Sequence, residues 1–379
     1  MTESYSLLTE QAELERFCER AGSASFLALD TEFVRQRTYF AKLGLIQIAV
    51  DDQLVLVDPL AIADLRPLWQ LLANPSIRVV IHAGGEDYEI LGQAMGTVPN
   101  NVFDTQIAAA FLGMGDALGY AALVERFGGP VLDKSQSRTD WTARPLSEEQ
   151  LRYAAADVTY LQQIYPQLAA QLDQQPQLRE LVLAETHFQV AKRQQQTPSE
   201  LLYLFFGNAW QCRGPQLVAL QKLLKWRFER AQAQDIPLSF VAKDNSLLEL
   251  ARKLPQQRRH LHSISELSPV TIRYAGEAIL ELIAAAQHES SADLVELQRL
   301  TDMRGYKAAY KAIKQVLDAQ AEALNIGVGL IGSRRQINDV IHWFWQIPPA
   351  LRKRLPKPDL LSSWRGELLA ATLTELLEN

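Results

Sequence analysis

The sequence predicts an α/β domain followed by helical domains, and three observations support this fold class. Apolar segments rich in β-branched residues lie between residues 26 and 83, helical periodicity begins near residue 60, and no convincing strand pattern follows residue 176. A chain of 379 residues is also too long for one ordinary core. We therefore expect a mixed sheet flanked by helices, and then two all-α domains.

The expected strands are close together near the start of the chain, at 26–30, 43–50, 54–58 and 77–83. The first three follow in quick succession, as in a meander. The later periodicity predicts helices at 60–73, 85–95, 104–112, 119–127 and 147–171. A mostly parallel dinucleotide-binding sheet is disfavoured, because the nearest glycine pattern, Gly113, Gly115 and Gly119, has the wrong last spacing and follows a helix.

Two polar segments divide the rest of the chain. AKRQQQTPSE at 191–200 is Gln-rich and contains a proline, which is typical of a linker, and HESSAD at 288–293 separates two helical stretches. The expected organisation is an α/β domain at 1–190, a linker at 191–207, and helical domains at 208–289 and 290–379.

Charge differs between the two halves of the chain. Residues 1–199 hold 15 Lys/Arg and 25 Asp/Glu, a net charge of −10, whereas the remainder holds 23 and 19, a net charge of +4, which together give the overall −6. Basic residues recur along two rear helical stretches, at Lys222, Lys225, Arg227 and Arg230, and at Lys307, Lys311 and Lys314. These residues form either a phosphate-binding face or ordinary solvent-facing charges.

The cysteines and the N-terminus favour a cytoplasmic protein. Cys18 and Cys212 are far apart and belong to no CxxC or Cys/His cluster, which argues against disulfides and structural zinc. The first residues lack the basic and apolar regions of a signal peptide, and no apolar run approaches the roughly 18 residues of a membrane span. We expect no membrane association.

Asp30 and Glu32 in LALDTEF are the first candidate site residues. They are two apart at the end of an apolar strand, so strand periodicity places both carboxylates on one face of the sheet. Two such acids raise at least one pKa unless a cation lies between them. A solvated strand end is the alternative for this segment alone.

Asp87 in HAGGEDYEIL follows Gly84 and Gly85 in the first turn of an expected helix. The helix dipole favours an acid there whatever its function, so this position carries little information alone. His82 lies beside it at a strand end, where a structural role is the more common one, and it is left out of the site.

Tyr153 and Asp157 in LRYAAADVTYL are four apart on an expected helix. Ser147 and Gln150 form a capping box at its start, and the spacing places the phenol and the carboxylate on one face. Three alanines between them keep the helix slim and permit a close approach to a sheet. An ordinary amphipathic helix is the alternative.

Taken together, four carboxylates and one phenol would form a site for hard divalent cations. Magnesium and manganese prefer oxygen ligands, and two such ions about 4 Å apart can hold both the attacking and the leaving oxygen of a phosphodiester. The residues therefore indicate a metal-dependent nuclease.

The ordered set DxE, Asp and YxxxD resembles the motifs of the DEDD superfamily of 3′-to-5′ exonucleases, in the subgroup with Tyr where others have His. The intervening segments resemble the bacterial ribonuclease D family over roughly residues 5–190, in LDTEFVRQRTYF, LGLIQIA, FDTQIAAAF and LDKSQSRTDWTARPLSEEQ. NAWQCRGPQLVALQKLLKWRFERAQ resembles an HRDC domain, and MRGYKAAYKAIKQVL, GSRRQIND and SSWRGELL resemble a second, divergent one. Ala41 departs from the proline of many relatives and touches no proposed ligand.

The resemblance implies an RNase H-like exonuclease domain followed by tandem HRDC domains, which are modules that bind nucleic acid. It assigns Asp30, Glu32 and Asp157 to one Mg²⁺ or Mn²⁺ ion, with Asp30 bridging to a second ion that Asp87 holds through water. Tyr153 would align the attacking water. The implied partner is RNA with a free 3′ end, such as a tRNA precursor, with no obligatory protein partner. A 3′-to-5′ exonuclease acting on DNA and a non-catalytic nucleic-acid adaptor are the alternatives.

Three further residues are candidates for substrate contacts. Lys134 and Arg138 precede the helix that carries Tyr153, and either meet phosphates near the scissile bond or belong to a solvated loop. Trp141 either stacks on a base or packs the loop.

Overall fold

The structure, a computed structural model, describes residues 4–132, 136 and 139–378. The chain forms two compact units. The first comprises Met1–Val34, Ala41–Gln195 and Ala319–Ile331, and the second comprises Arg35–Phe40, Gln196–Asp318 and Gly332–Asn379. The two helical stretches that the sequence separates therefore fall largely within one unit.

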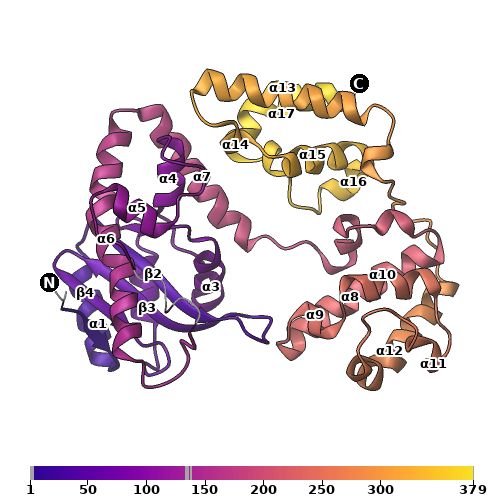
Figure 1. Cartoon of the computed structure of the whole chain (residues 1–379), viewed down its shortest axis with the longest axis horizontal. Helices are drawn as coiled ribbons and strands as arrows, with labels where there is room; N and C mark the ends of the chain where they lie inside the picture. The colour runs from indigo at the N-terminus through magenta and orange to yellow at the C-terminus, as the bar shows by residue number, and fades with distance from the viewer. Residues whose placement is uncertain (1–3, 133–135, 137–138, 379) are drawn as a thin grey trace. The chain divides into compact units, whose positions relative to one another are not determined.

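A six-stranded mixed sheet forms the centre of the first unit (Figure 1). The strand order is β1-β4-β3-β2-β5-β6, with β1 at Ser6–Leu8, β2 at Phe26–Val34, β3 at Lys42–Val50, β4 at Gln53–Val57, β5 at Arg78–Ile81 and β6 at Val102–Asp104. Strands β2, β3 and β4 pair antiparallel, whereas β1, β5 and β6 pair in parallel with their neighbours. The predicted mixed sheet and its initial meander are confirmed.

The sequence did not predict β1 and β6, which are the two edge strands. Each has only three residues, so neither can display the alternation that identifies a strand. Strand β6 nevertheless has a direct bearing on the site, because its last residue, Asp104, is buried beside the turn that precedes Asp87.

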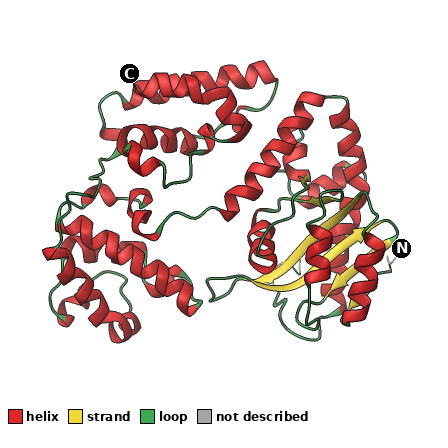
Figure 2. Ribbon diagram, turned by 180° about the vertical axis from the view of Figure 1, so that it is seen from behind, coloured by secondary structure: helices red, strands yellow, loops and turns green. Residues whose placement is uncertain are grey.

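Helices cover both faces of the sheet (Figure 2). Their bounds are α1 Gln11–Ala21, α2 Arg66–Leu72, α3 Gly85–Met95, α4 Thr105–Phe111, α5 Tyr120–Arg126, α6 Glu148–Asp173 and α7 Pro176–Gln194. Leu27 and Leu29 of β2 pack in a cluster with residues of α1, α2, α3 and α7. Ala28 packs instead against Val158 and Leu161 of α6. Because side chains alternate along a strand, Asp30 and Glu32 share the face that α6 covers.

Beyond α7 the described residues contain helices and connecting segments only. The bounds are η1 Ser199–Phe205, η2 Ala209–Gln211, α8 Pro215–Gln234, α9 Leu238–Val241, α10 Asp244–Lys253, α11 Arg258–Leu261, α12 Pro269–His288, η3 Leu300–Asp302, α13 Tyr306–Leu324, α14 Val328–Ile331, α15 Arg334–Gln346, α16 Pro349–Arg352, η4 Asp359–Leu361 and α17 Ser363–Glu378. The all-α character predicted for the rear of the chain is what the structure has.

The predicted linker at 191–207 differs from the structure at its second half. Helix η1 lies inside that range, and its Leu201, Tyr203 and Leu204 are buried in the main hydrophobic cluster of the second unit. Only a few residues between α7 and η1 connect the elements. The polar composition of 191–200 concealed the apolar LLYLFF that follows, which explains the difference.

Cys18 and Cys212 are both free and buried. Within the described part of the chain, every helix is too short or too polar to cross a bilayer.

Candidate active site

Strand β2 places the first two acids. Leu27, Ala28 and Leu29 are fully buried, so the strand is fixed within the sheet before it reaches Asp30. The pairing register then shifts, because Glu32 pairs with Leu45 whereas Phe33 pairs with Leu43. Gly44 is the extra residue of this β-bulge, a distortion that is common beside active sites because it redirects a neighbouring side chain.

Helix α6 supplies the phenol and the third acid. Ser147 and Gln150 form the predicted capping box, with Gln150 N donating to Ser147 Oγ over 3.2 Å and Ser147 N donating to Gln150 Oε1 over 3.0 Å. Ala154 and Ala155 are buried against the sheet, as expected for a helix that must approach closely. Tyr153 and Asp157 stand on the same side of α6, close enough for each side chain to shift the pKa of the other.

Three carboxylates converge where β2 meets α6. One oxygen each from Asp30, Glu32 and Asp157 lie within 4.8 Å of one another. Among the described residues, this is the one group of acids, histidines or cysteines with the spacing to hold a metal ion. The predicted juxtaposition of the DxE strand and the YxxxD helix is therefore present.

Asp87 lies beside this group but outside the 4.8 Å set. It is in the first turn of α3, only 8% exposed, and accepts a hydrogen bond from Thr31 Oγ1, which lies between Asp30 and Glu32 in the sequence. Its charge contributes to raising the pKa values of Asp30 and Glu32. Asp87, on α3, therefore lies next to the carboxylate group that β2 and α6 form.

A fifth acid, Asp104, holds the turn that leads to Asp87, and the sequence did not identify it. Its carboxylate is 3% exposed and accepts hydrogen bonds from the N–H groups of Ala83 and Gly84, each over 3.0 Å, and from the Tyr88 hydroxyl over 2.9 Å. It also caps α4. The only signal in the sequence was an Asp directly before a predicted helix in FDTQ, which is common at helix N-termini.

His82 is a structural residue of this turn, in keeping with its exclusion from the predicted site. Its Nδ1 lies 2.9 Å from Thr105 Oγ1, and its ring lies 5.6 Å from that of Tyr120. Tyr120, which the sequence also left unassigned, donates from its hydroxyl to the Ala156 carbonyl oxygen of α6 over 2.8 Å. These contacts support α6 behind the carboxylate group.

The electrostatics of the site favour a bound cation. Burial, followed by the charges of the neighbouring carboxylates, raises the pKa of Asp30 well above its usual range. The same causes raise the pKa of Glu32 to about 9. Burial raises the pKa of Asp157 to about 7, although the neighbouring Tyr153 side chain opposes the shift. Carboxylates in such a group repel one another when ionised, and a divalent cation would offset that repulsion.

The donor set fits magnesium or manganese. All the candidate ligands are carboxylate oxygens, which hard cations prefer, and the described residues add no sulfur or imidazole donor to the group. The pKa of Asp87 is raised by burial to about 6, with the hydrogen bond from Thr31 acting in the opposite direction. The acidic cluster is thus chemically suited to divalent metal.

Of the three residues predicted to contact the substrate, the structure describes only Trp141. Trp141 is 1% exposed and packs with Leu45, Leu56 and Leu151, so it has no free ring face for a base. Of its two suggested roles, base stacking is incompatible with this burial, and packing of the loop is what the structure shows. Lys134 and Arg138 lie outside the described residues.

The basic residues of α8 and α13 differ in their surroundings. On α8, Lys222 pairs with Glu289 over 2.6 Å, Lys225 pairs with Glu229 over 3.8 Å, and Arg227 pairs with Asp244 over 2.5 Å. The guanidinium of Arg230 lies over the Trp226 ring, at 6.0 Å from its centroid. Lys307, Lys311 and Lys314 are exposed along α13. A phosphate-binding face on α13 stays a prediction.

Comparison with known protein families identifies the class of each part. Residues 5–173 match the family described as "3'-5' exonuclease". Residues 216–283 match "HRDC domain", and residues 304–373 match "Ribonuclease D, C-terminal HRDC domain". The α/β unit with its acidic centre is therefore an exonuclease domain, and two HRDC domains follow it in the sequence.

Full-length relatives specify the family further. The chain is 41% identical over 376 residues to ribonuclease D of Escherichia coli, and 40% identical over 376 residues to that of Serratia proteamaculans, in each case covering 99% of both chains. The crystal structure of E. coli RNase D, "an exoribonuclease involved in structured RNA processing", superposes with a TM-score of 0.91 at 40% identity over 99% of both chains. The chain belongs to the ribonuclease D family.

Proposed function

We propose that this chain removes nucleotides one at a time from the free 3′ end of RNA, using two divalent ions, Mg²⁺ or Mn²⁺. The observation that carries this proposal is the convergence of Asp30, Glu32 and Asp157, whose carboxylate oxygens lie within 4.8 Å of one another. The family to which the chain belongs supports RNA rather than DNA as the substrate.

The acids would divide between the two ions. Asp30, Glu32 and Asp157 would hold one ion, and Asp30 and Asp87 would hold the second. The separation of Asp87 from the three-oxygen group supports that division. When bound, such ions make water a better nucleophile at neutral pH and offset the charge that grows on the leaving oxygen.

Tyr153 would orient the attacking water. Its side chain lies beside the carboxylate group, and burial, followed by the charges of Asp157, Glu32 and Asp30, raises its pKa above the usual value, which keeps it protonated. A protonated phenol can donate one hydrogen bond and accept another. In the reaction, the water would lose a proton as its oxygen bonds to phosphorus, and the bond from phosphorus to the 3′ oxygen would break as that oxygen takes a proton. The product is a nucleoside 5′-monophosphate.

Single-stranded RNA and DNA of matched sequence, labelled at the 5′ end, would test this proposal. Each would be incubated with Mg²⁺ or with EDTA, using wild type and Asp30→Asn. We expect ladder shortening of RNA by wild type with Mg²⁺ only. Equal shortening of both strands would favour the DNA exonuclease, and absence of metal-dependent cleavage would favour the non-catalytic adaptor.

The preferred substrate would be a structured RNA with a single-stranded 3′ tail, such as a tRNA precursor. The superposition on E. coli RNase D supports structured RNA, and the resemblance of the motifs supports the tRNA precursor. A tRNA transcript with a short 3′ tail should lose the tail, whereas the same transcript with a 3′-terminal phosphate should resist. Because the described acids complete the site within one chain, we expect activity without a protein partner.

A further inference from the structure

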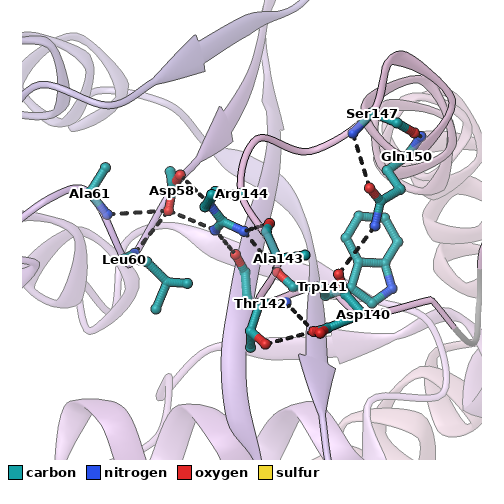
Figure 3. Close-up of polar contacts among 11 residues, drawn as sticks. Asp58, Leu60, Ala61, Asp140, Trp141, Thr142, Ala143, Arg144, Ser147 and Gln150 are labelled. Carbon is teal, nitrogen blue, oxygen red and sulfur yellow. Dashed lines mark hydrogen bonds and ion pairs between the residues drawn. The ribbon is translucent and has the colours of Figure 1, made fainter.

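A further buried acid in the first unit, Asp58, directly follows β4 and is paired with Arg144 (Figure 3). The pair is bidentate, with Arg144 Nε donating to Asp58 Oδ2 over 2.6 Å and Nη2 donating to Oδ1 over 2.7 Å. Asp58 also accepts from the N–H groups of Leu60 and Ala61. Neither residue belongs to the carboxylate group that would bind metal.

Arg144 reaches beyond Asp58 to two other segments. Its Nη2 donates to the Gly44 carbonyl oxygen over 2.7 Å, and its Nη1 donates to the carbonyl oxygens of Trp141 and Ala143 over 2.9 and 2.8 Å. One guanidinium therefore joins the end of β4, the bulge of β3, and the loop that leads into α6. Figure 3 shows Arg144 between Asp58 and the backbone of this loop.

Gly44 makes the close approach of the loop possible. A Cβ atom at this position would lie 2.5 Å from the Trp141 carbonyl oxygen, which is far inside normal contact. Gly44 is also the bulge residue, directly beside the pairing of Glu32 with Leu45. The contact thus links the loop to the part of the sheet that presents Glu32.

The loop carries Trp141, which packs in one cluster with residues of the sheet and with Tyr153. The indole packs with Leu45, the partner of Glu32, and with Leu56 of β4. Its ring centroid is 6.1 Å from that of Tyr153. Trp141 therefore contacts both the strand that pairs with β2 and the ring of Tyr153.

We propose that Arg144, held by Asp58, is a positioning residue for the reaction, because it fixes the Trp141 segment against Gly44 and thereby sets the place of the Tyr153 hydroxyl. Arginine suits this task because its planar fork makes several directed hydrogen bonds at once, which lysine cannot reproduce. This inference rests on the proposed role of Tyr153 in the reaction.

Double-mutant cycles on kcat would test the inference. Wild type, Arg144→Met, Tyr153→Phe and the double variant would be compared on labelled RNA at saturating Mg²⁺ and substrate. We expect each single change to lower kcat about tenfold with little change in KM, because a displaced orienting group affects the reacting geometry more than binding. The double variant should also fall about tenfold, because Arg144 acts through Tyr153.

An additive result would overturn the inference. If the double variant falls about a hundredfold while thermal melting shows both singles folded at the assay temperature, Arg144 acts independently of Tyr153. Unchanged kcat in Arg144→Met would overturn it as well. If Tyr153→Phe alone leaves kcat unchanged, the proposed role of Tyr153 fails, and this inference fails with it; loss of all metal-dependent cleavage in wild type would instead reject the proposed function.

Gly44→Ala provides a second route that leaves the ion pair intact. Its added methyl group should displace the Trp141 segment, and we expect the same lack of additivity with Tyr153→Phe. This variant replaces Arg144→Met in the cycle if the latter does not fold, with additivity again overturning the inference. The matched control is Arg66→Met, which removes an exposed pair with Asp64 on the same unit and should leave kcat unchanged.

Discussion

Asp58 and Glu32 are both buried acids of the exonuclease domain, at 4% and 9% exposed, but their surroundings shift their pKa values in opposite directions. Burial alone would raise the pKa of Asp58, yet hydrogen bonds from Arg144 and from two backbone N–H groups hold it below its usual value. Glu32 has other carboxylates as neighbours, and its pKa rises to about 9.

The difference separates a structural acid from a functional one. The charge of Asp58 is offset by Arg144 and by backbone N–H groups, so this residue stabilises the fold without any ligand. The charges of Asp30, Glu32 and Asp157 are left facing one another, which costs stability unless a cation binds. Buried acids of the two kinds should therefore respond in opposite ways to neutralisation and to metal.

The largest effect is expected from Asp30→Asn. Turnover should fall by about 10³-fold or more, because the acids act as one unit in holding the ions. Melting in EDTA should be unchanged or higher than in wild type, because one repelling charge is gone. Steady-state cleavage and thermal melting measure the two quantities, and a folded variant with near-normal turnover would contradict the proposed role.

Asp58→Asn should show the opposite pattern. Loss of the ion pair and its hydrogen bonds should lower the free energy of unfolding by about 2–3 kcal/mol, a value reduced for the partial exposure of Arg144. Turnover should fall far less than in Asp30→Asn. Urea unfolding with and without Mg²⁺ would measure this, and equal stability of the variant and wild type would show that the pair contributes nothing.

Asp104→Asn should alter the need for metal. The amide cannot accept all the hydrogen bonds that Asp104 receives from the turn before α3, so Asp87 should be held less well. We expect about a tenfold higher Mg²⁺ concentration for half-maximal activity, with turnover recovering as Mg²⁺ rises. A loss of activity that no Mg²⁺ concentration restores would indicate a general loss of structure instead.

A further prediction concerns the pH dependence of the metal-free protein. Glu32 has a usual pKa of 4.5 and a folded value of about 9, and Asp157 shifts from 3.8 to about 7. The folded state thus binds protons more tightly than the unfolded state, and stability falls as pH rises from about 4 to about 9. The slope should not exceed about 1.4 kcal/mol per pH unit for each proton.

Melting in EDTA across this pH range measures the slope. Glu32→Gln should flatten it, and Mg²⁺ should stabilise wild type more at pH 8 than at pH 5. Stability of the metal-free protein that increases towards pH 9 would contradict the raised pKa values.

Local patterns in the sequence were sufficient to predict those parts of the site that lie within a single strand or helix. The two-residue spacing of Asp30 and Glu32, the four-residue spacing of Tyr153 and Asp157, and the capping box of α6 each follow from the geometry of a single strand or helix. Their convergence came from the order of the motifs and the family resemblance, because spacing within an element says nothing about which elements meet.

Features that depend on long-range contacts were not predictable in this way. Asp104 bonds to a turn some 20 residues earlier, and the burial of Trp141 depends on a glycine in a distant strand. The apolar residues of η1 are buried only because α8 and its neighbours provide the matching surface. In each case the residue type is ordinary, and its environment comes from another part of the chain.

The most direct test of whether the carboxylates of the acidic group form a cation site is calorimetric titration of Mn²⁺ at pH 7. Wild type, Glu32→Gln and Asp58→Asn would be compared. Binding to wild type and Asp58→Asn, with strong loss in Glu32→Gln, is the predicted result. Equal binding to wild type and Glu32→Gln, or none to folded wild type, would contradict it.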